Sequence, residues 1–164
     1  MMGAGKTTIG RALARRLRKT FVDADQEIES RTGVRIPVIF DIEGEDGFRR
    51  REAQVLQQLT AESSIVLATG GGAVLNPENR RCLARSGVVV YLDVPPDVLW
   101  ERLRHDTARP LLKVEDPRGR IAQLYGQRDP LYREIADLVV AGGREPPSML
   151  LKELEREIRK RCAQ

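Results

Sequence analysis

Apolar positions along the chain follow two spacings, one typical of helices and one typical of buried strands. Ile9, Leu13 and Leu17 recur every four residues, which predicts a helix over 6–18 with one buried face. Residues 88–92 form an unbroken apolar run, which is typical of a strand buried on both faces of a parallel sheet. Segments of these two kinds alternate along the sequence, and this alternation predicts an α/β fold.

The same pattern gives the remaining elements. Short strands are expected over 20–22, 64–68 and 136–140, and helices over 25–32, 45–62, 77–86, 96–104, 125–135 and 149–161. A polar segment containing proline and arginine, 105–119, is expected to form a loop. We find no repeats and no linker in the sequence, so we expect a single domain over 1–164.

Composition excludes several classes of protein. Hydrophobic residues make up 41% of the chain and charged residues 32%, which fits neither a disordered chain nor a fibre. The apolar runs are far shorter than the ~20 residues of a membrane span, and no secretory pattern opens the sequence. We therefore expect a cytoplasmic protein without membrane contact. Cys82, Cys162 and the single His105 are not spaced for metal binding.

The charge balance points to small anions as ligands. Net charge is +4 and the pI is near 9.4, but the basic residues are spread among the acidic ones. Aromatic residues do not interleave with a basic stripe, so we expect no nucleic-acid partner. Arginine outnumbers lysine by 23 to 5. This bias suits bidentate contacts with phosphate or carboxylate groups.

The segment GAGKT at 3–7 carries the clearest chemical signal. Its glycines let successive N–H groups point at phosphate oxygens, and the positive end of the following helix adds to their attraction. Lys6 can reach the β- and γ-phosphates, and Thr7 can hold Mg²⁺. The residues expected to bind ATP here are Gly3, Ala4, Gly5, Lys6, Thr7 and Thr8.

The loop lacks the first part of the complete motif, G-x-x-x-x-G-K-[ST]. The first glycine would precede Met1, and so would the strand that ordinarily enters the loop. Such a strand usually lies inside the sheet, so its loss would leave several buried backbone hydrogen bonds unmade, at ~1–3 kcal/mol each. We hypothesise that the start is truncated or misassigned, or that another segment fills the gap.

Two carboxylates, Asp23 and Asp25, follow the strand expected over 20–22. On a strand, positions i and i+2 face the same way, so we expect both side chains to enter one cleft. One would serve Mg²⁺ and the other would orient a hydroxyl group. The alternative is that Asp25 only caps the next helix.

Taken together, the motifs resemble those of the shikimate kinases, a family of P-loop enzymes related to the nucleoside-monophosphate kinases. The matching segments are GAGKTTIGRALA from Gly3, FVDAD from Phe21, IFDIEGEDGFRRRE from Ile39, LATGGGAV from Leu67, RPLL from Arg109 and RDPLY from Arg128. The resemblance covers essentially the whole chain from Met2. It implies a three-layer α/β/α P-loop kinase fold with a mostly parallel sheet, from which the first strand would be missing.

The family's activity gives the expected function. The resemblance implies phosphorylation of the 3-hydroxyl of shikimate by ATP with Mg²⁺, giving shikimate 3-phosphate and ADP in chorismate and aromatic amino-acid biosynthesis. It also divides the single domain into a nucleotide core, a shikimate-binding region at about 23–52 and a lid at about 105–119. Shikimate is the expected partner, and we expect the protein to be a monomer.

The resemblance assigns roles on the acceptor side. By this resemblance Asp25 contacts the shikimate hydroxyls and is the candidate base, while Asp23 supports Mg²⁺. Arg49 and Arg128 bind the carboxylate, which suits the planar guanidinium fork. Glu52 supports the arginine site by pairing. The backbone that approaches the substrate ring is that of Gly70, Gly71 and Gly72.

The resemblance also assigns roles on the nucleotide side. Arg109, in the lid, reaches the phosphate in transfer and neutralises its developing charge, and lid closure keeps water out. Lys6 and Arg109 join Asp25 as the catalytic residues. For adenine, the nearest matches are Arg102 and Pro147, the latter from the loop at 144–147.

Two alternatives remain open from the residues. The two arginines indicate an acidic acceptor but do not distinguish one carboxylate from another, so another small-molecule kinase, for example one acting on gluconate, fits as well. The second alternative is a non-catalytic module that binds nucleotide or ligand, because the phosphate loop is incomplete.

Overall fold

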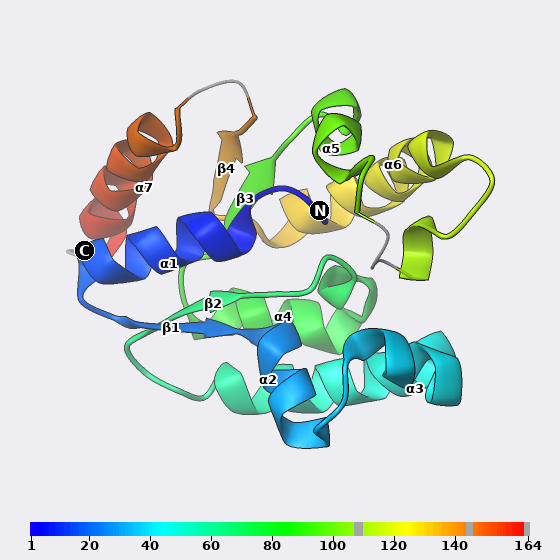
Figure 1. Ribbon diagram of the computed structural model, residues 1–164. Coiled ribbons are helices and arrows are strands. Elements are labelled where there is room, and N and C mark those ends of the chain that lie inside the picture. The colour runs from blue at the N-terminus through cyan, green and yellow to red at the C-terminus, as the bar shows by residue number, and fades with distance from the viewer. Residues whose placement is uncertain (107–109, 144–145, 163–164) are drawn as a thin grey trace.

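The computed structural model describes residues 1–106, 110–143 and 146–162, in which helices and strands alternate as predicted (Figure 1). In chain order the elements are α1 (Lys6–Leu17), β1 (Thr20–Asp23), α2 (Ala24–Thr32), α3 (Ile36–Leu59), β2 (Ile65–Ala68), the 3₁₀ helix η1 (Ala73–Leu75), α4 (Pro77–Ser86), β3 (Val90–Asp93), α5 (Pro96–Leu103), the 3₁₀ helix η2 (Pro110–Leu112), α6 (Pro117–Ile135), β4 (Leu138–Ala141) and α7 (Pro147–Cys162). The α/β class is confirmed.

The strands form two parallel pairs. β1 pairs with β2 from Thr20 opposite Ile65 onward, and β3 pairs with β4 from Val90 opposite Leu138 onward. The parallel direction agrees with the sequence. In the described part of the chain β2 and β3 do not pair with each other, and no other segment lies between them as a strand.

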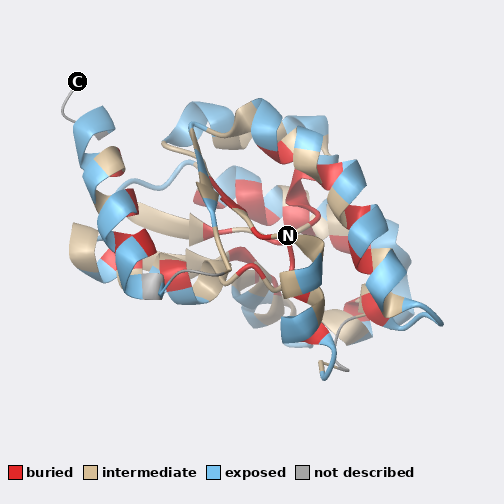
Figure 2. Cartoon of the chain, turned by 90° about the horizontal axis from the view of Figure 1, so that it is seen from above, coloured by how far each residue is buried: buried red, intermediate tan, exposed pale blue. Residues whose placement is uncertain are grey.

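Each strand pair has an apolar core of its own. The larger core joins α1, β3, α5, α6 and α7, with Leu99, Ile121 and Leu154 almost fully buried. The smaller core joins α2 to α3 through Ile28 and Leu56. Figure 2 shows the buried residues on the inner sides of the helices and around the N-terminus. The site described below lies where these two halves meet.

Local signals explain where α2 begins and ends. The carboxylate of Asp23 accepts hydrogen bonds from the backbone N–H groups of Asp25 and Gln26, and it thereby caps the helix. Gly33, with φ of 69°, ends the helix as predicted. Asp25 lies in the first turn of α2, beyond the end of β1. Asp25 is thus not on a strand, so the reasoning that Asp23 and Asp25 face the same way along a strand is wrong. Asp23, rather than Asp25, caps α2.

The sequence pattern misses a helical segment ahead of 45 and the true start of α6. α3 runs from Ile36, but its helical conformation breaks at Gly44, where φ is 70°, and the part after this break begins at 45 as predicted. α6 starts at Pro117 instead of 125, because Asp116 caps it by accepting from the N–H of Gly119 at 2.9 Å. The end of the segment expected as a lid loop is thus helical. None of the helices in the described ranges is long and apolar enough for a membrane span.

Candidate active site

The phosphate loop lies at the start of α1, where the sequence places it. Gly3 and Gly5 have φ values of 70° and 89°, in the left-handed region that favours glycine. No side chain caps α1, so its first N–H groups are available to an anion. Lys6 Nζ donates to the carbonyl oxygen of Met1 at 2.6 Å. The lysine therefore lies over its own loop.

A hydrogen bond connects this loop to the acidic segment. Thr7 Oγ1 donates to Asp23 Oδ2 at 2.7 Å, which brings together the two residues predicted to serve Mg²⁺. Magnesium is ordinarily held by one or two carboxylates together with substrate phosphates and water. The described residues contain no group of three or more acidic, histidine or cysteine side chains placed for a metal. One hydroxyl and one carboxylate are a donor set that fits a cation arriving with a nucleotide.

Arg49 is held by two carboxylates on α3. Its Nη1 donates to Glu52 Oε2 at 2.7 Å, and its Nη2 donates to Glu45 Oε1 at 3.0 Å. Burial is the largest single cause and lowers the pKa of Arg49, but the charges and hydrogen bonds of Glu52 and Glu45 together outweigh it, so the pKa is raised. The guanidinium therefore stays charged and fixed in direction.

Arg128, on α6, is a buried guanidinium that is only partly paired. Its side chain is 2% exposed, its Nη1 donates to the carbonyl oxygen of Gly71 at 3.1 Å, and its Nε has no hydrogen-bond partner. Burial is the main cause that lowers the pKa of Arg128, and the nearby charge of Arg49 lowers it further. A buried guanidinium and a partly exposed one thus lie close together, and an anion placed between them would stabilise both.

Gly70, after β2, brings the backbone against two acids. A Cβ at this position would lie 2.5 Å from Glu52 Oε1 and 2.9 Å from Asp25 Oδ1. Burial raises the pKa of Glu52, Arg49 opposes this shift, and the charge of Asp25 adds to it. Glu52 is fully buried, and its Oε1 has no hydrogen-bond partner. The two carboxylates therefore lie next to each other beneath this glycine.

The next two glycines bring the backbone against the arginines. A Cβ on Gly72 would overlap the guanidinium of Arg49. A Cβ on Gly71 would lie 3.6 Å from Arg128 Nη1 and 3.1 Å from the backbone nitrogen of Met2. The triplet thus joins the arginine pair to the segment that enters the phosphate loop. The structure brings together the acceptor-side residues that the sequence predicts.

The start of the chain lies between the two parts of the site. The Met1 amine is buried, and its pKa is lowered by burial first and then by the charges of Lys6 and Arg128. Lys6 belongs to the phosphate loop and Arg128 to the acceptor side. The two parts are therefore adjacent, on the side where β1 and β2 end.

Sequence reasoning did not find a polar network that ties α6 to β3. Tyr91 Oη donates to Asp129 at 2.9 Å, and Tyr125 Oη donates to Asp93 at 2.7 Å. Arg133 donates to both carboxylates, to Asp93 at 2.6 Å and to Asp129 at 2.9 Å. The network surrounds the part of α6 that carries Arg128. Two signals could have indicated it, namely an acid at the end of a strand and an Asp–Arg pair spaced i, i+4.

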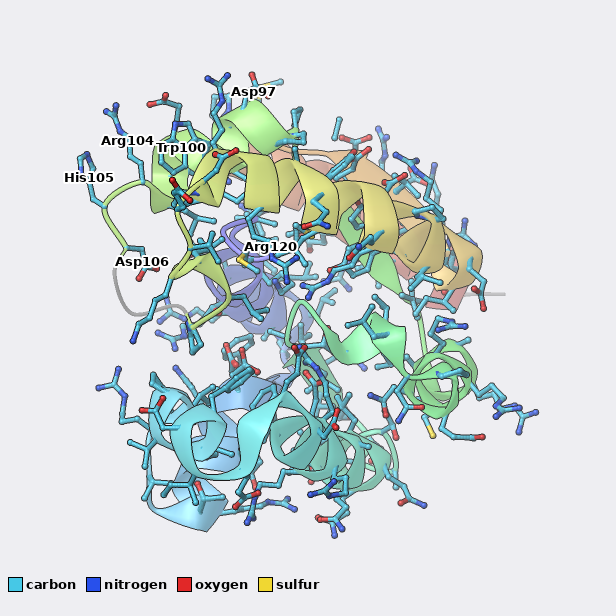
Figure 3. All side chains as sticks on the ribbon, turned by 90° about the vertical axis from the view of Figure 1, so that its right-hand side faces the viewer. Asp97, Trp100, Arg104, His105, Asp106 and Arg120 are labelled. Atoms are coloured by element: carbon cyan, nitrogen blue, oxygen red, sulfur yellow. The ribbon has the colours of Figure 1, made fainter. Side chains whose placement is uncertain are left out.

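The nucleotide-side predictions are only partly described. Arg102 Nη1 donates to the carbonyl oxygen of Gly3 at 3.1 Å, so this arginine does lie beside the phosphate loop. Arg109 lies outside the described residues. Pro147 begins α7, but its side chain is outside the description. Figure 3 shows Arg104 and His105 at the outer edge of the molecule, in the turn that follows α5.

A glycine, lysine and threonine in sequence at a helix start, with the threonine bonded to an acid at the end of a parallel strand, place the chain among the P-loop kinases. The pair formed by buried Arg128 and partly exposed Arg49 indicates a small anionic acceptor for this kind of enzyme. The chain belongs to the shikimate kinase family, because the model of that family, "Shikimate kinase", matches residues 2–159.

Individual sequences and structures similar to this chain support its membership of the family. A shikimate kinase of Aromatoleum aromaticum is 61% identical over 158 residues, covering 96% of this chain and 90% of its own length. One of Burkholderia lata is 61% identical over 159 residues, covering 94% of this chain and 86% of its own. The structure of shikimate kinase from Acinetobacter baumannii in complex with shikimate matches with a TM-score of 0.94 at 46% identity, covering 98% of this chain and 89% of that one. A shikimate kinase structure from Bacteroides thetaiotaomicron gives a TM-score of 0.88 at 34% identity. This match covers 96% of this chain and 94% of that one.

Proposed function

We propose that this protein transfers the γ-phosphate of ATP to the 3-hydroxyl of shikimate, giving shikimate 3-phosphate and ADP, a step toward chorismate and the aromatic amino acids. The observation that carries the proposal is the buried Arg128, whose Nε has no partner and whose neighbour is a second charged guanidinium, Arg49. A carboxylate is the planar anion that matches such a pair. The match to a relative in complex with shikimate supports the choice of acceptor.

On the acceptor side, Arg49 and Arg128 hold the carboxylate of shikimate. Glu52 keeps Arg49 in place through their 2.7 Å ion pair. Asp25 accepts a hydrogen bond from the attacking hydroxyl and orients it toward the phosphate loop. The glycines at 70–72 leave room for the ring, because any side chain there would meet the acids or the arginines.

On the nucleotide side, the N–H groups of the loop and Lys6 hold the phosphates of ATP. Thr7 and Asp23 hold Mg²⁺, which when bound neutralises charge on the phosphates. Arg102, next to Gly3, and Pro147 contact the adenine end. Arg109 approaches the phosphate in transfer from the lid and stabilises its developing charge, while the lid excludes water.

The assay is ADP release with Mg-ATP and either shikimate or gluconate as acceptor. We expect turnover with shikimate only, since membership of the shikimate kinase family does not favour a gluconate kinase or a non-catalytic module. Asp25→Asn should lower kcat by roughly 10²–10⁴-fold, the usual contribution of a positioned acid or base. Arg49→Ala should raise KM for shikimate by about tenfold or more, because a charged hydrogen bond is worth ~1.5–3 kcal/mol.

The matched control is Arg50→Ala, which removes an exposed arginine adjacent to Arg49. It should leave kcat and KM unchanged. If folded Asp25→Asn and Arg49→Ala proteins both retained the wild-type kcat and KM, the assignment of the acceptor site would be wrong. Turnover with gluconate in place of shikimate would overturn the choice of substrate.

A further inference from the structure

Glu45 lies where an incoming carboxylate would bind Arg49. A guanidinium offers a carboxylate two edges, one formed by Nε and Nη2 and the other by the two Nη nitrogens. Glu45 Oε1 accepts from Arg49 Nε at 3.3 Å and from Nη2 at 3.0 Å, so it occupies the first edge. Nη1, on the second edge, donates to Glu52 Oε2 at 2.7 Å. A substrate carboxylate can therefore form a two-bond contact with Arg49 only by sharing the guanidinium with these acids or by replacing one of them.

Of the two acids, Glu45 is the one that can leave. The side chain of Glu52 is 0% exposed, whereas that of Glu45 is 45% exposed, in the first turn of α3 after the break at Gly44. Arg49 is the more enclosed member of its pair with Glu45, because its Cζ lies 5.2 Å from the centre of the Phe48 ring. An ion pair open to water contributes little to stability. Glu45 can therefore turn into solvent with little loss.

The charge of Glu45 acts on both arginines of the acceptor site. Burial is the largest cause acting on the pKa of Arg49 and lowers it, and the contacts of Glu52 and Glu45 together reverse that effect. Burial also lowers the pKa of Arg128, and the charge of Glu45 is among the causes that oppose it. Glu45 thus presents the same chemical group to the same two cations as the carboxylate of the acceptor would.

The acceptor carboxylate and Glu45 are unfavourable together. Two acids already lie beside Arg49, and a third negative charge in this partly buried region would be repelled by both. An exchange, in which Glu45 turns into water as the substrate carboxylate arrives, leaves the charge of the site unchanged. We propose that Glu45 competes with the acceptor carboxylate for Arg49, holding the guanidinium in the free enzyme and setting the affinity for the acceptor. This inference rests on the proposed function.

The test is Glu45→Gln, which removes the charge and keeps the size of the side chain. The matched control is Asp46→Asn. Asp46 is the next residue and is also exposed, and the contacts of Arg49 within the described residues do not include it. The control therefore removes a charge from the same turn of α3 and leaves the edge of Arg49 occupied. The readouts are the Kd for shikimate and for ATP by calorimetry, kcat and KM by ADP release, and Tm.

We expect Glu45→Gln to lower the Kd and the KM for shikimate by about two- to fivefold, with kcat and the Kd for ATP unchanged. Glu45→Ala, which removes the carboxylate altogether, should give the same gain. Asp46→Asn should leave all of these constants at their wild-type values. The methyl ester of shikimate, which carries no negative charge, should bind Glu45→Gln no more tightly than it binds the wild type.

A Kd for shikimate that is unchanged or higher in folded Glu45→Gln and Glu45→Ala proteins would overturn the proposal. An equal gain in Asp46→Asn would do the same, because the effect would then be one of overall charge, and so would an equal gain for the methyl ester. If the wild type failed to phosphorylate shikimate, the proposed function would be wrong, and this inference with it. Normal wild-type turnover without tighter binding by the Glu45 variants would overturn the competition alone.

Discussion

The phosphate loop and the arginine site differ in how they are built, although they are neighbours. The loop is built from residues that are close together in the chain, because its conformation depends on Gly3, Gly5 and the start of α1. The arginine site draws on distant segments, with Arg49 from α3, the glycines after β2 and Arg128 from α6. A local site is sensitive to backbone conformation, and an assembled site is sensitive to packing between elements.

A hydrogen bond from Thr7 to Asp23 connects the loop to the start of α2, which carries Asp25. The two sites share part of their support, because α6, which carries Arg128, packs in the same larger core as the loop. The loop packs with the larger core, and most of α3, with Glu52, belongs to the half that holds the smaller core. We therefore expect substitutions in the two regions to affect different ligands, and the following predictions test that separation from the largest effect to the smallest.

Among the substitutions that test this separation, Gly72→Ala should produce the largest effect. The new methyl group would occupy the place of the Arg49 guanidinium, so the arginine must leave its position. Its flexible side chain can move at little cost in stability, but the acceptor carboxylate loses a charged partner. We expect kcat/KM for shikimate to fall by roughly 10–100-fold, with Tm nearly unchanged and ATP affinity unaffected.

The control is Gly126→Ala on α6, where a Cβ would meet nothing within 4 Å. It should leave kcat/KM unchanged and raise the free energy of unfolding by up to ~1 kcal/mol, because alanine favours helix over glycine. Equal kinetics for the two variants would contradict the packing argument.

Gly5→Ala should weaken nucleotide binding and spare the acceptor. The residue has φ of 89°, which costs an alanine about 1–2 kcal/mol, although its Cβ would meet no atom. We expect the Kd for ATP, measured by calorimetry, to rise about tenfold and the Kd for shikimate to stay the same. Gly87→Ala, at an extended backbone position, is the control and should change neither. A parallel loss of shikimate affinity would show that the two sites are not separable.

Tyr91→Phe should loosen the acceptor site from a distance. The substitution keeps the ring stacked on Tyr132 but removes the 2.9 Å hydrogen bond to Asp129, beside Arg128. We expect the free energy of unfolding to fall by about 1 kcal/mol and KM for shikimate to rise a few-fold, with kcat unchanged. Tyr125→Phe removes a similar bond from a part of α6 farther from Arg128, and it should lower stability without changing KM. An unaltered KM in both variants would restrict the network to a structural role.

Glu52→Gln should give the smallest effect, which appears in the pH dependence of stability. Burial raises the pKa of Glu52 above 4.5 in the folded protein, so the folded state binds the proton more tightly than the unfolded state. Its contribution is fully present below the unfolded pKa and is lost as pH rises through the folded pKa, at most about 1.4 kcal/mol per pH unit. Urea unfolding across pH 4–7 should show this decline in the wild type and a weaker one in Glu52→Gln. Parallel curves would mean that the pKa is not raised.

Most of the fold was predictable because its signals are local. Apolar spacing identified α1, and Gly33 marked the end of α2, since a glycine with positive φ is a common helix terminator. The part of α3 ahead of Gly44 and the early start of α6 were not predicted. The break at Gly44 separates that first part from the helical period recognised from 45 onward, and the start of α6 falls in a proline-containing segment that was interpreted as loop.

The sequence by itself determined the phosphate loop and the identity of the acceptor-side residues, because motif order and spacing identify them. Only the tertiary structure decided that Asp25, Arg49 and Arg128 come together, since they approach the glycines at 70–72 from three different helices, α2, α3 and α6. Tertiary structure also decided that, in the described part of the chain, β2 and β3 do not pair with each other. Strand pairing joins segments far apart in the chain, so local residue preferences do not reveal which edges are left unpaired.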